Sequence, residues 1–473
     1  MNSKVKYLSK NIFLFAFSSF VPKLFAFFLI PIYTSILSTE EYGIADLITT
    51  TTSLLIPIFS LDIQDAVIRF VMDKLYDKKD VFSISIYINT IGFLLLTFIT
   101  TLIVMLNIIE LPRFFFIYST ILFFLNSIYN SLIMFYKGNE EVKKVVVGST
   151  ILSIGIIVLN ILFLVVFKFG LQGYICSTVL GYLLSTIYLI FSGRVYKYFK
   201  LKINKKTLFD MIKYSFPLIF SVIAWWINAA SDRYILTWIA GVSASGLYAV
   251  SNKIPGILGV FYGIFSQAWS ISAIKHFDKE DTDGFFGNIF MMLNFMLCIL
   301  CSIIFIFNVL IAKLLYAGEF VSAWRYVPIL LMSVLLHSVS LFIGYIFTAT
   351  KDTKSLSSST ILGALVNTIL NIVLIKRFNA YGAAIATLIG YSVIYIIRYL
   401  RLRKYIHMKI NMKTVIVSYI MLFIQMILAL FGNKFIILEI IIFALLLCLN
   451  KKYIISSFMM IKSIIIRKTS SEK

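Results

Sequence analysis

The chain has 473 residues, of which 60% are hydrophobic and only 14% are charged, and its mean hydropathy is +0.95. This composition lies far outside the range of soluble domains and indicates an integral membrane protein. The formal net charge of +22 does not indicate nucleic-acid binding, because the basic residues cluster in short segments between apolar runs, as membrane anchors do.

The first predicted span covers residues 11–36 and carries Lys23 near its middle. It is long enough to cross a hydrocarbon core of about 30 Å at about 1.5 Å per residue. Roughly 20 Å of helix separates Lys10 from Lys23, so the Lys23 ammonium does not easily reach either surface and needs water, a counter-ion or a ligand. The apolar region is too long for a signal peptide, and we expect an uncleaved first helix.

Hydropathy over a window of about 19 residues predicts roughly 14 helical spans, bounded by charged residues or by Gly, Asn and Pro. The expected spans are residues 11–36, 44–68, 81–107, 114–136, 145–167, 171–192, 214–240, 244–270, 286–313, 326–349, 357–375, 379–400, 413–431 and 435–449. The predicted fold class is therefore an all-α integral membrane protein.

Positive charge is concentrated in alternate loops. The segments "RVYKYFKLKINKK" from Arg194, "RYLRLRK" from Arg398 and the tail from Lys451 are rich in Lys and Arg, whereas "STEEYG" and "YAGEF" are short and not basic. About 33 basic residues then lie on one side and about 7 on the other, so the positive-inside rule places both termini in the cytoplasm. We expect a multi-pass protein of the bacterial inner membrane.

The sequence also repeats itself. The stretch "STILSIGIIVLNILFLVVFKFGLQGYICSTVLGY" from Ser149 matches "STILGALVNTILNIVLIKRFNAYGAAIATLIGY" from Ser359, and both copies run in the same direction. A weaker match pairs "STEEYGIADL" from Ser38 with "VSASGLYAV" from Val242. Parallel repeats of six helices predict two bundles related by an axis along the membrane normal, which is a transporter architecture with the substrate site between the halves.

The repeat suggests a division of the chain into five parts. The expected parts are an N-terminal six-helix bundle over 1–193, a basic cytoplasmic linker over 194–213, a C-terminal six-helix bundle over 214–404, two extra spans over 405–450 and a basic cytoplasmic tail over 451–473.

Two lysines, Lys23 on the first span and Lys253 on the eighth, lie deepest in apolar surroundings. Ionisable groups at such depth usually face a bundle interior or a water-filled cavity, because exposure to lipid costs several kcal/mol. The alternative is a buried lysine that is satisfied by local carbonyls or by a carboxylate. On the same span as Lys253, a stripe of small and polar residues at helical spacing forms either a packing seam or a cavity wall: Asn252, Gly256, Gly259, Gly263 and Ser266.

Two further groups of charges lie near span ends. Asp232 and Arg233 fall near the outer end of the seventh span, where an interfacial ion pair is the alternative to a functional role. Asp62, Asp65 and Arg69 are spaced i, i+3 and i+7 at the cytoplasmic end of the second span, where they could also form a solvated cap.

Other sequence features carry no chemistry that we would assign. The pair in "CILC", Cys298 and Cys301, lies on an apolar helix without a second pair or a nearby histidine and is expected to pack. The chain has no "GxxxxGK[ST]" phosphate loop and no catalytic constellation. We therefore expect no enzyme activity, no metal and no cofactor.

Two stretches resemble a known family. The segment from Asn11, "NIFLFAFSSFVPKLFAFFLIPIYTSILSTEEYGIADL" and its continuation to Phe70, resembles the opening of bacterial polysaccharide flippases. The segment "AASDRYILTWIAGVSASGLYAVSNKI" from Ala229 resembles their seventh and eighth helices. These flippases belong to the multidrug, oligosaccharidyl-lipid and polysaccharide exporter superfamily. The resemblance runs roughly from Lys10 to Arg401 and implies movement of an undecaprenyl-diphosphate-linked oligosaccharide from the inner to the outer leaflet by alternating access.

The resemblance also implies roles for single residues. In related flippases a cationic cavity is lined by the first, second, seventh and eighth helices, so Lys23 and Lys253 match positions that meet the pyrophosphate of the lipid. Arg69 matches a helix-two arginine at the cytoplasmic entrance. The family has a glycine before that stretch, where this chain has Leu61 and Asp62.

Asp232 and Arg233 resemble the acidic and basic pair on the seventh helix of the family, with a role in gating or in binding the substrate. The implied partners are the lipid-linked oligosaccharide, membrane lipids, and polymerase and glycosyltransferases of the same pathway. Three other functions remain open from the sequence: a peptidoglycan-precursor (lipid II) flippase, a cation-coupled multidrug exporter of the same superfamily, and a membrane scaffold for glycosyltransferases.

Overall fold

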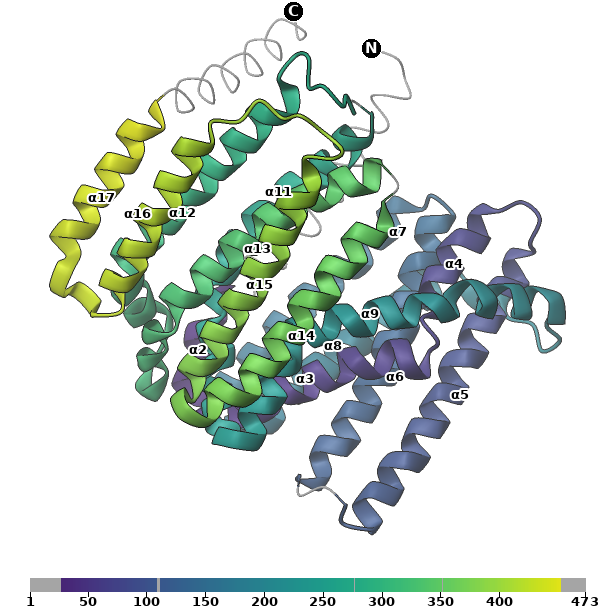
Figure 1. Ribbon diagram of the computed structural model, residues 1–473. Coiled ribbons are helices and arrows are strands. Elements are labelled where there is room, and N and C mark those ends of the chain that lie inside the picture. Colours follow the sequence, from purple (N-terminus) through teal and green to yellow (C-terminus); the bar gives the residue numbers. More distant parts are fainter. Residues whose placement is uncertain (1–26, 109–110, 276, 351, 452–473) are drawn as a thin grey trace, which may run out of the picture. The chain divides into compact units, whose positions relative to one another are not determined.

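The computed structural model describes residues 27–108, 111–275, 277–350 and 352–451 (Figure 1). Every regular element in these ranges is a helix, and 12 of the helices are long and apolar enough to cross a membrane. The predicted fold class, an all-α protein with many membrane spans, is confirmed.

The helices of the N-terminal half follow the expected spans closely. They are α2 (Ile30–Ile36), α3 (Thr39–Phe59), α4 (Ile63–Met72), α5 (Lys78–Met105), α6 (Arg113–Gly138), α7 (Val142–Asn160) with the π-helical turn η1 (Ile161–Val166), α8 (Gly170–Ser192) and the 3₁₀ turn η2 (Val195–Tyr198).

The remaining helices show the same agreement. They are α9 (Lys205–Ala240), α10 (Val242–Ser251), α11 (Lys253–Lys275), α12 (Phe285–Leu315), the 3₁₀ turn η3 (Gly318–Arg325), α13 (Val327–Ala349), α14 (Thr353–Phe378), α15 (Ala380–Leu402), α16 (Met412–Ala429), the 3₁₀ turn η4 (Gly432–Phe435) and α17 (Ile436–Leu449).

Two expected spans are interrupted. The span predicted over 44–68 is divided into α3 and α4, because Leu61 and Asp62 adopt positive φ angles of 53° and 49°, which no α-helix accommodates. The span predicted over 244–270 is divided at Asn252 into α10 and α11. Most of the first predicted span, including Lys23, lies outside the described residues.

The chain divides into two compact units by its contacts. The first unit comprises Met1–Thr237 with Gly241–Gly246, and the second comprises Trp238–Ala240 with Leu247–Lys473. Most of α9 therefore packs within the first unit. The five-part division with its boundary at the basic linker remains a prediction.

Within each unit the repeated helix pair packs through a glycine. In the first unit, a Cβ built on Gly181 of α8 would lie 2.4 Å from Ile156 of α7. In the second, a Cβ on Gly390 of α15 would lie 2.8 Å from Asn367 of α14. Both glycines therefore permit a close approach of helices that a larger residue would prevent.

Between a shared asparagine and a shared glycine, the first copy of the repeat contains two more residues than the second. Asn160 and Gly173 are 13 positions apart, whereas Asn371 and Gly382 are 11 apart. The π-helical turn η1 begins directly after Asn160, and π turns are the usual way in which a helix takes up inserted residues. The insertion therefore widens the end of α7 and leaves the packing at Gly181 in place.

The last two helices pack on α12 (Figure 1). Gln425 of α16 donates to the Ser302 carbonyl over 3.1 Å and accepts from the Ser302 hydroxyl over 2.7 Å. Tyr419 donates to Asn294 over 2.6 Å. These buried hydrogen bonds attach α16 to the second unit with a defined register, because an unpaired amide in an apolar interior would be costly.

The start of the basic linker is held against α5. Lys200 lies 2.5 Å from Asp77 and 3.5 Å from Asp80, and its backbone N–H donates to the Ser83 hydroxyl over 2.8 Å. The hydrogen bond from Lys200 lowers the pKa of Asp77 below its usual value. This part of the predicted linker is therefore an ordered connection and not a free tether.

Candidate substrate site

Of the two lysines predicted to meet the pyrophosphate of the lipid, Lys23 and Lys253, the structure describes Lys253. It is half-buried and opens α11 directly after the interruption at Asn252. Gly256, Gly259 and Gly263 follow it on the same helix, and apart from α11 itself no described atom lies within 4 Å of a Cβ built on any of the three. The stripe is thus not a packing seam against described residues, and next to Lys253 no described residue outside α11 covers the three glycines.

Asp232 and Arg233 do not form an ion pair with each other. Asp232 is buried on α9, and its Oδ1 accepts a hydrogen bond of 2.9 Å from the backbone N–H of Arg233. The Arg233 guanidinium instead lies against Asp46 of α3, with 2.8 Å between Nε and Oδ2. Both side chains are largely buried, so the pair is less screened by water than a surface ion pair.

Sequence reasoning missed Asp46 as the partner of Arg233. Ser38 and Glu41 form a capping box that fixes the start of α3, and Asp46 follows within the apolar run "GIADL". An acidic residue in such a run was the available signal, because it needs a counter-charge at the same depth.

A small cavity of about 200 Å³ surrounds this ion pair. Its walls come from α3 and α9 and are formed by Asp46, Thr49, Thr50, Ser53, Trp225, Trp226, Ala229, Ala230 and Arg233. The Trp226 indole donates to the Thr50 carbonyl and to the Ser53 hydroxyl, each over 3.1 Å. The cavity combines indole rings, hydroxyl groups and one charge of each sign, a polar lining suited to a ligand with several hydroxyl groups.

Asp62 and Arg69 lie at a different place on the first unit. Along α3, Asp46 and the break at Asp62 are separated by about 24 Å. Asp62 is buried before the start of α4 and accepts from the Gln64 amide over 2.7 Å, whereas the Arg69 side chain is exposed. Because of the break, Asp62 does not share a continuous helix face with Arg69, contrary to the i, i+7 spacing that the sequence suggested.

Arg398 is an intramembrane charge that the sequence analysis counted in a basic segment although it falls within the expected span 379–400. The structure places it inside α15, buried, with its guanidinium bonded to neutral oxygens. Its Nη1 donates to the Ser340 carbonyl over 2.8 Å, Nη2 to Thr360 over 2.9 Å and Nε to Ser359 over 3.1 Å. Arg398 therefore links α13, α14 and α15 and is satisfied by this packing.

The structure brings together two of the six predicted site residues. Asp232 and Arg233 lie beside the cavity that Asp46 lines, while Asp62 lies at the α3–α4 break and Arg69 in the last turn of α4. Lys253 lies on α11 of the second unit, and Lys23 lies outside the described residues. The substrate-binding role of all six remains a prediction.

Several solved structures share this fold. The lipid II flippase MurJ in its inward closed conformation is similar with a TM-score of 0.70 and 16% sequence identity, over 96% of this chain and 100% of that chain. An inward-facing multidrug resistance MATE family transporter of the MOP superfamily is similar with a TM-score of 0.64 and 14% identity, over 81% and 94%. A MOP superfamily transporter from Pyrococcus furiosus gives 0.55 and 16%, over 84% and 95%.

A comparison with curated protein sequences gives no significant match. A family model described as "Polysaccharide biosynthesis protein" matches residues 8–271. This match covers more than half of the chain and includes the α3–α9 cavity and the lysine at the start of α11. The protein is therefore a member of the polysaccharide biosynthesis protein family, a multi-pass membrane protein with the fold of the MOP superfamily transporters.

Proposed function

We propose that this protein is a flippase for an undecaprenyl-diphosphate-linked oligosaccharide, which it moves from the inner to the outer leaflet of the bacterial cytoplasmic membrane by alternating access. The observation that carries the proposal is that Lys253 precedes three glycines of α11 whose Cβ positions no described residue outside that helix approaches within 4 Å. A diphosphate carries about two negative charges, and its attraction to a lysine is much stronger in a low-dielectric cavity than in water.

The glycine face suits this substrate for a second reason. A face without side chains leaves room beside the lysine for a headgroup that is bulkier than a single ion, and it lets the headgroup pass along the helix. Lys23 would supply a second positive charge from the first helix, and Arg69 would meet the headgroup at the cytoplasmic entrance. Asp62 would position the α3–α4 turn beside that entrance.

The cavity between α3 and α9 would contact the glycan. Sugars offer many hydroxyl groups that donate and accept hydrogen bonds, and at this cavity the Asp46 carboxylate offers an acceptor and the Arg233 guanidinium offers donors. The Asp46–Arg233 pair would either bind the glycan or open during transport, with Asp232 holding the backbone at Arg233. Both termini would lie in the cytoplasm. The partners of the protein would be polymerase and glycosyltransferases of the same pathway.

Transport in reconstituted vesicles tests the proposal. A fluorescent undecaprenyl-diphosphate oligosaccharide is placed in both leaflets, and a membrane-impermeant reductant then bleaches the label that reaches the outer one. We expect the native protein to flip the lipid and Lys253→Gln to slow it by about tenfold or more. Lys376→Gln is the matched control, because Lys376 is an exposed lysine near the other end of a helix of the same unit.

A lipid II flippase is the second candidate, favoured by the similarity to MurJ over 96% of this chain. Fluorescent lipid II in the same vesicles distinguishes the two, because both share the diphosphate and differ in the glycan. Preferential flipping of lipid II would replace the proposed substrate. No flipping of either lipid by the native protein would overturn the flippase proposal, and uptake of a cationic drug would then point to an exporter.

A further inference from the structure

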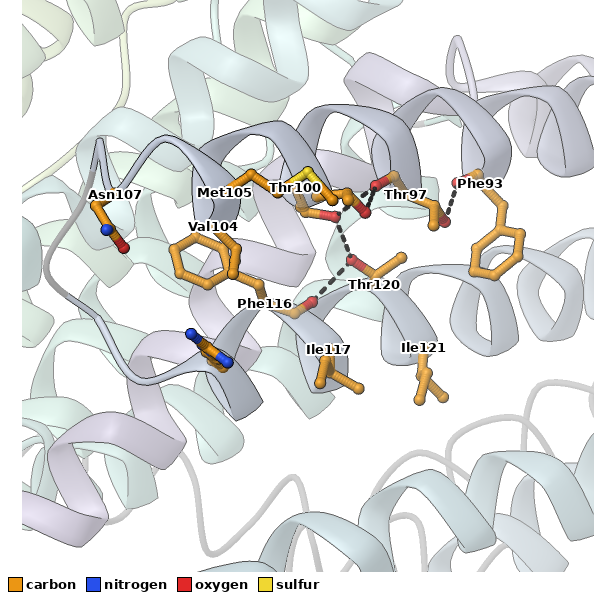
Figure 2. Close-up of a pocket in the computed structure, with 12 residues that line it drawn as sticks. Phe93, Thr97, Thr100, Val104, Met105, Asn107, Phe116, Ile117, Thr120 and Ile121 are labelled. Carbon is orange, nitrogen blue, oxygen red and sulfur yellow. Dashed lines mark hydrogen bonds between the residues drawn. The ribbon is translucent and has the colours of Figure 1, made fainter.

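A groove of about 540 Å³ lies between α5 and α6 (Figure 2). None of its lining residues lines the cavity on α3 and α9. One end of it lies at the connection between the two helices, where Asn107 and Arg113 line it, and the other reaches Phe93 and Ile121. From Asn107 to Phe93 the groove follows about 21 Å of helix. Its volume is in the range of ligand pockets, roughly 300–1,000 Å³.

The wall of the groove is more apolar than its sequence suggests. Four threonines line it, and each donates its hydroxyl to a carbonyl of its own helix, so that the donors are not available to a ligand: Thr97 to Phe93 over 2.7 Å, Thr100 to Leu96 over 2.9 Å, Thr101 to Thr97 over 2.7 Å and Thr120 to Phe116 over 2.8 Å. Figure 2 shows Thr100 and Thr120 meeting across the two helices, with 3.5 Å between their oxygens. The surface thus offers mainly methyl groups and the rings of Phe93 and Phe116.

The end at the helix connection carries Arg113. Arg113 is exposed, and no carboxylate of the described ranges forms an ion pair with it. Glu110, three positions earlier, lies outside the described residues. The groove therefore has a charged end at the end of two spans and an apolar length inside them. An amphiphile with an anionic head and one hydrocarbon chain in the groove matches this gradient.

The neighbourhood of the groove identifies the medium that fills it. Phe98, Leu102 and Met105 of α5 are 63%, 39% and 73% exposed. α5 is long and apolar enough to cross a membrane, and few residues of its apolar stretch are buried within the protein. In a membrane these side chains face hydrocarbon, since exposure of such a helix to water would be unfavourable. A groove on this face is filled from the bilayer.

We propose that the α5–α6 groove is a binding site for an anionic phospholipid, with one acyl chain between the helices and the phosphate on the Arg113 guanidinium. By the predicted orientation the lipid belongs to the outer leaflet. The site is separate from the proposed transport site, and its size suits one acyl chain better than a whole oligoprenyl chain. The bound lipid would hold together the outer ends of α5 and α6.

Native mass spectrometry of the full chain tests this proposal without any transport assay. The protein is reconstituted in nanodiscs of phosphatidylcholine and phosphatidylglycerol, and the lipids that remain bound after release are counted. We expect Arg113→Gln to lower the ratio of retained phosphatidylglycerol to phosphatidylcholine by about tenfold, and Arg113→Lys to restore part of it. Thr101→Trp, which fills the groove, should lower retention of both lipids.

Phe98→Trp is the matched control, because it places the same indole on the exposed face of α5 outside the groove. A photoreactive phosphatidylglycerol with the reactive group on its acyl chain should label peptides from 93–121 in the native protein and in Phe98→Trp. Labelling elsewhere, or equal lipid ratios in all variants, overturns the proposal. Displacement of the phospholipid by an undecaprenyl-diphosphate lipid at this site would also overturn it, because the groove would then belong to the substrate.

Discussion

At the scale of single residues, Arg233 and Arg398 are both largely buried, and their positive charges are stabilised in different ways. Arg233 has a carboxylate partner on a neighbouring helix, whereas Arg398 has neutral acceptors from three helices. A guanidinium presents five donors in a fixed plane and is suited to the second arrangement, while a single carboxylate is enough for the first. The two residues should therefore respond differently to replacement.

Removing one partner of the Asp46–Arg233 pair should destabilise the protein, because the other charge would remain largely buried and would lose the oppositely charged group that lies 2.8 Å away. We expect Asp46→Asn and Arg233→Gln each to lower the thermal stability in detergent, and the double variant to lose less than the sum. The coupling free energy should be about 1–3 kcal/mol. Thermal unfolding of the four proteins measures it, and additive effects would show that the pair contributes no coupling.

At the scale of elements, the break between α3 and α4 depends on backbone conformation and not on hydropathy. Leu61 and Asp62 are both in the left-handed region, where a residue with a Cβ costs roughly 1–2 kcal/mol. The turn is maintained because Gln64 bonds Asp62 and because Leu61 packs against the core formed by α4, α5 and α6.

Position 61 gives a prediction that distinguishes conformation from packing. Leu61→Val keeps an apolar side chain but places a β-branched residue in the left-handed region, where branching at Cβ is disfavoured more than leucine is, so it should be less stable than the native protein. Leu61→Gly loses the packing but relieves the strain, so it should be more stable than Leu61→Val. Thermal unfolding of both variants tests this order, and a valine variant as stable as the native protein would contradict the strain argument.

The same scale explains what the sequence could and could not predict. Helix spans were predictable, because hydropathy over about 19 residues follows membrane thickness directly. The break at Leu61–Asp62 was not, because it depends on local dihedral angles that hydropathy does not record. Arg398 was counted with a basic segment, because a cluster of basic residues marks the end of a membrane span but does not show which of its side chains is buried in the protein.

The candidate site was predictable in part for a similar reason. Asp232 and Arg233 stand out in an apolar span, but the partner of Arg233 is Asp46, which is 187 positions earlier in the chain. A single sequence does not reveal a contact at such a distance. For the glycines of α11, the sequence left two alternatives, a packing seam or a cavity wall. No described residue outside α11 lies near these glycines, so they do not form a packing seam with the described part of the chain.

At the scale of the whole molecule, the weak repeat between the starts of α3 and α10 has a structural counterpart. The two repeat copies meet at their glycines: a Cβ on Gly246 would lie 1.9 Å from the Thr39 carbonyl oxygen, and a Cβ on Gly43 would lie 2.4 Å from that of Val242. The hydroxyls of Thr39 and Ser243 are 2.7 Å apart in the same crossing. These helix starts are on the predicted outer side, so the crossing would close that side.

If alternating access requires this crossing to open, a covalent link across it should stop transport. Thr39→Cys with Ser243→Cys places two thiols where two hydroxyls now touch, close enough for a disulfide. The background must lack the native cysteines, which are Cys176, Cys298, Cys301 and Cys448. We expect oxidation to abolish flipping in vesicles and reduction to restore it, whereas each single cysteine variant should flip lipid equally under both conditions. A fully oxidised double variant that still flips lipid would show that the starts of α3 and α10 stay together throughout the cycle, and the opening would then have to occur elsewhere.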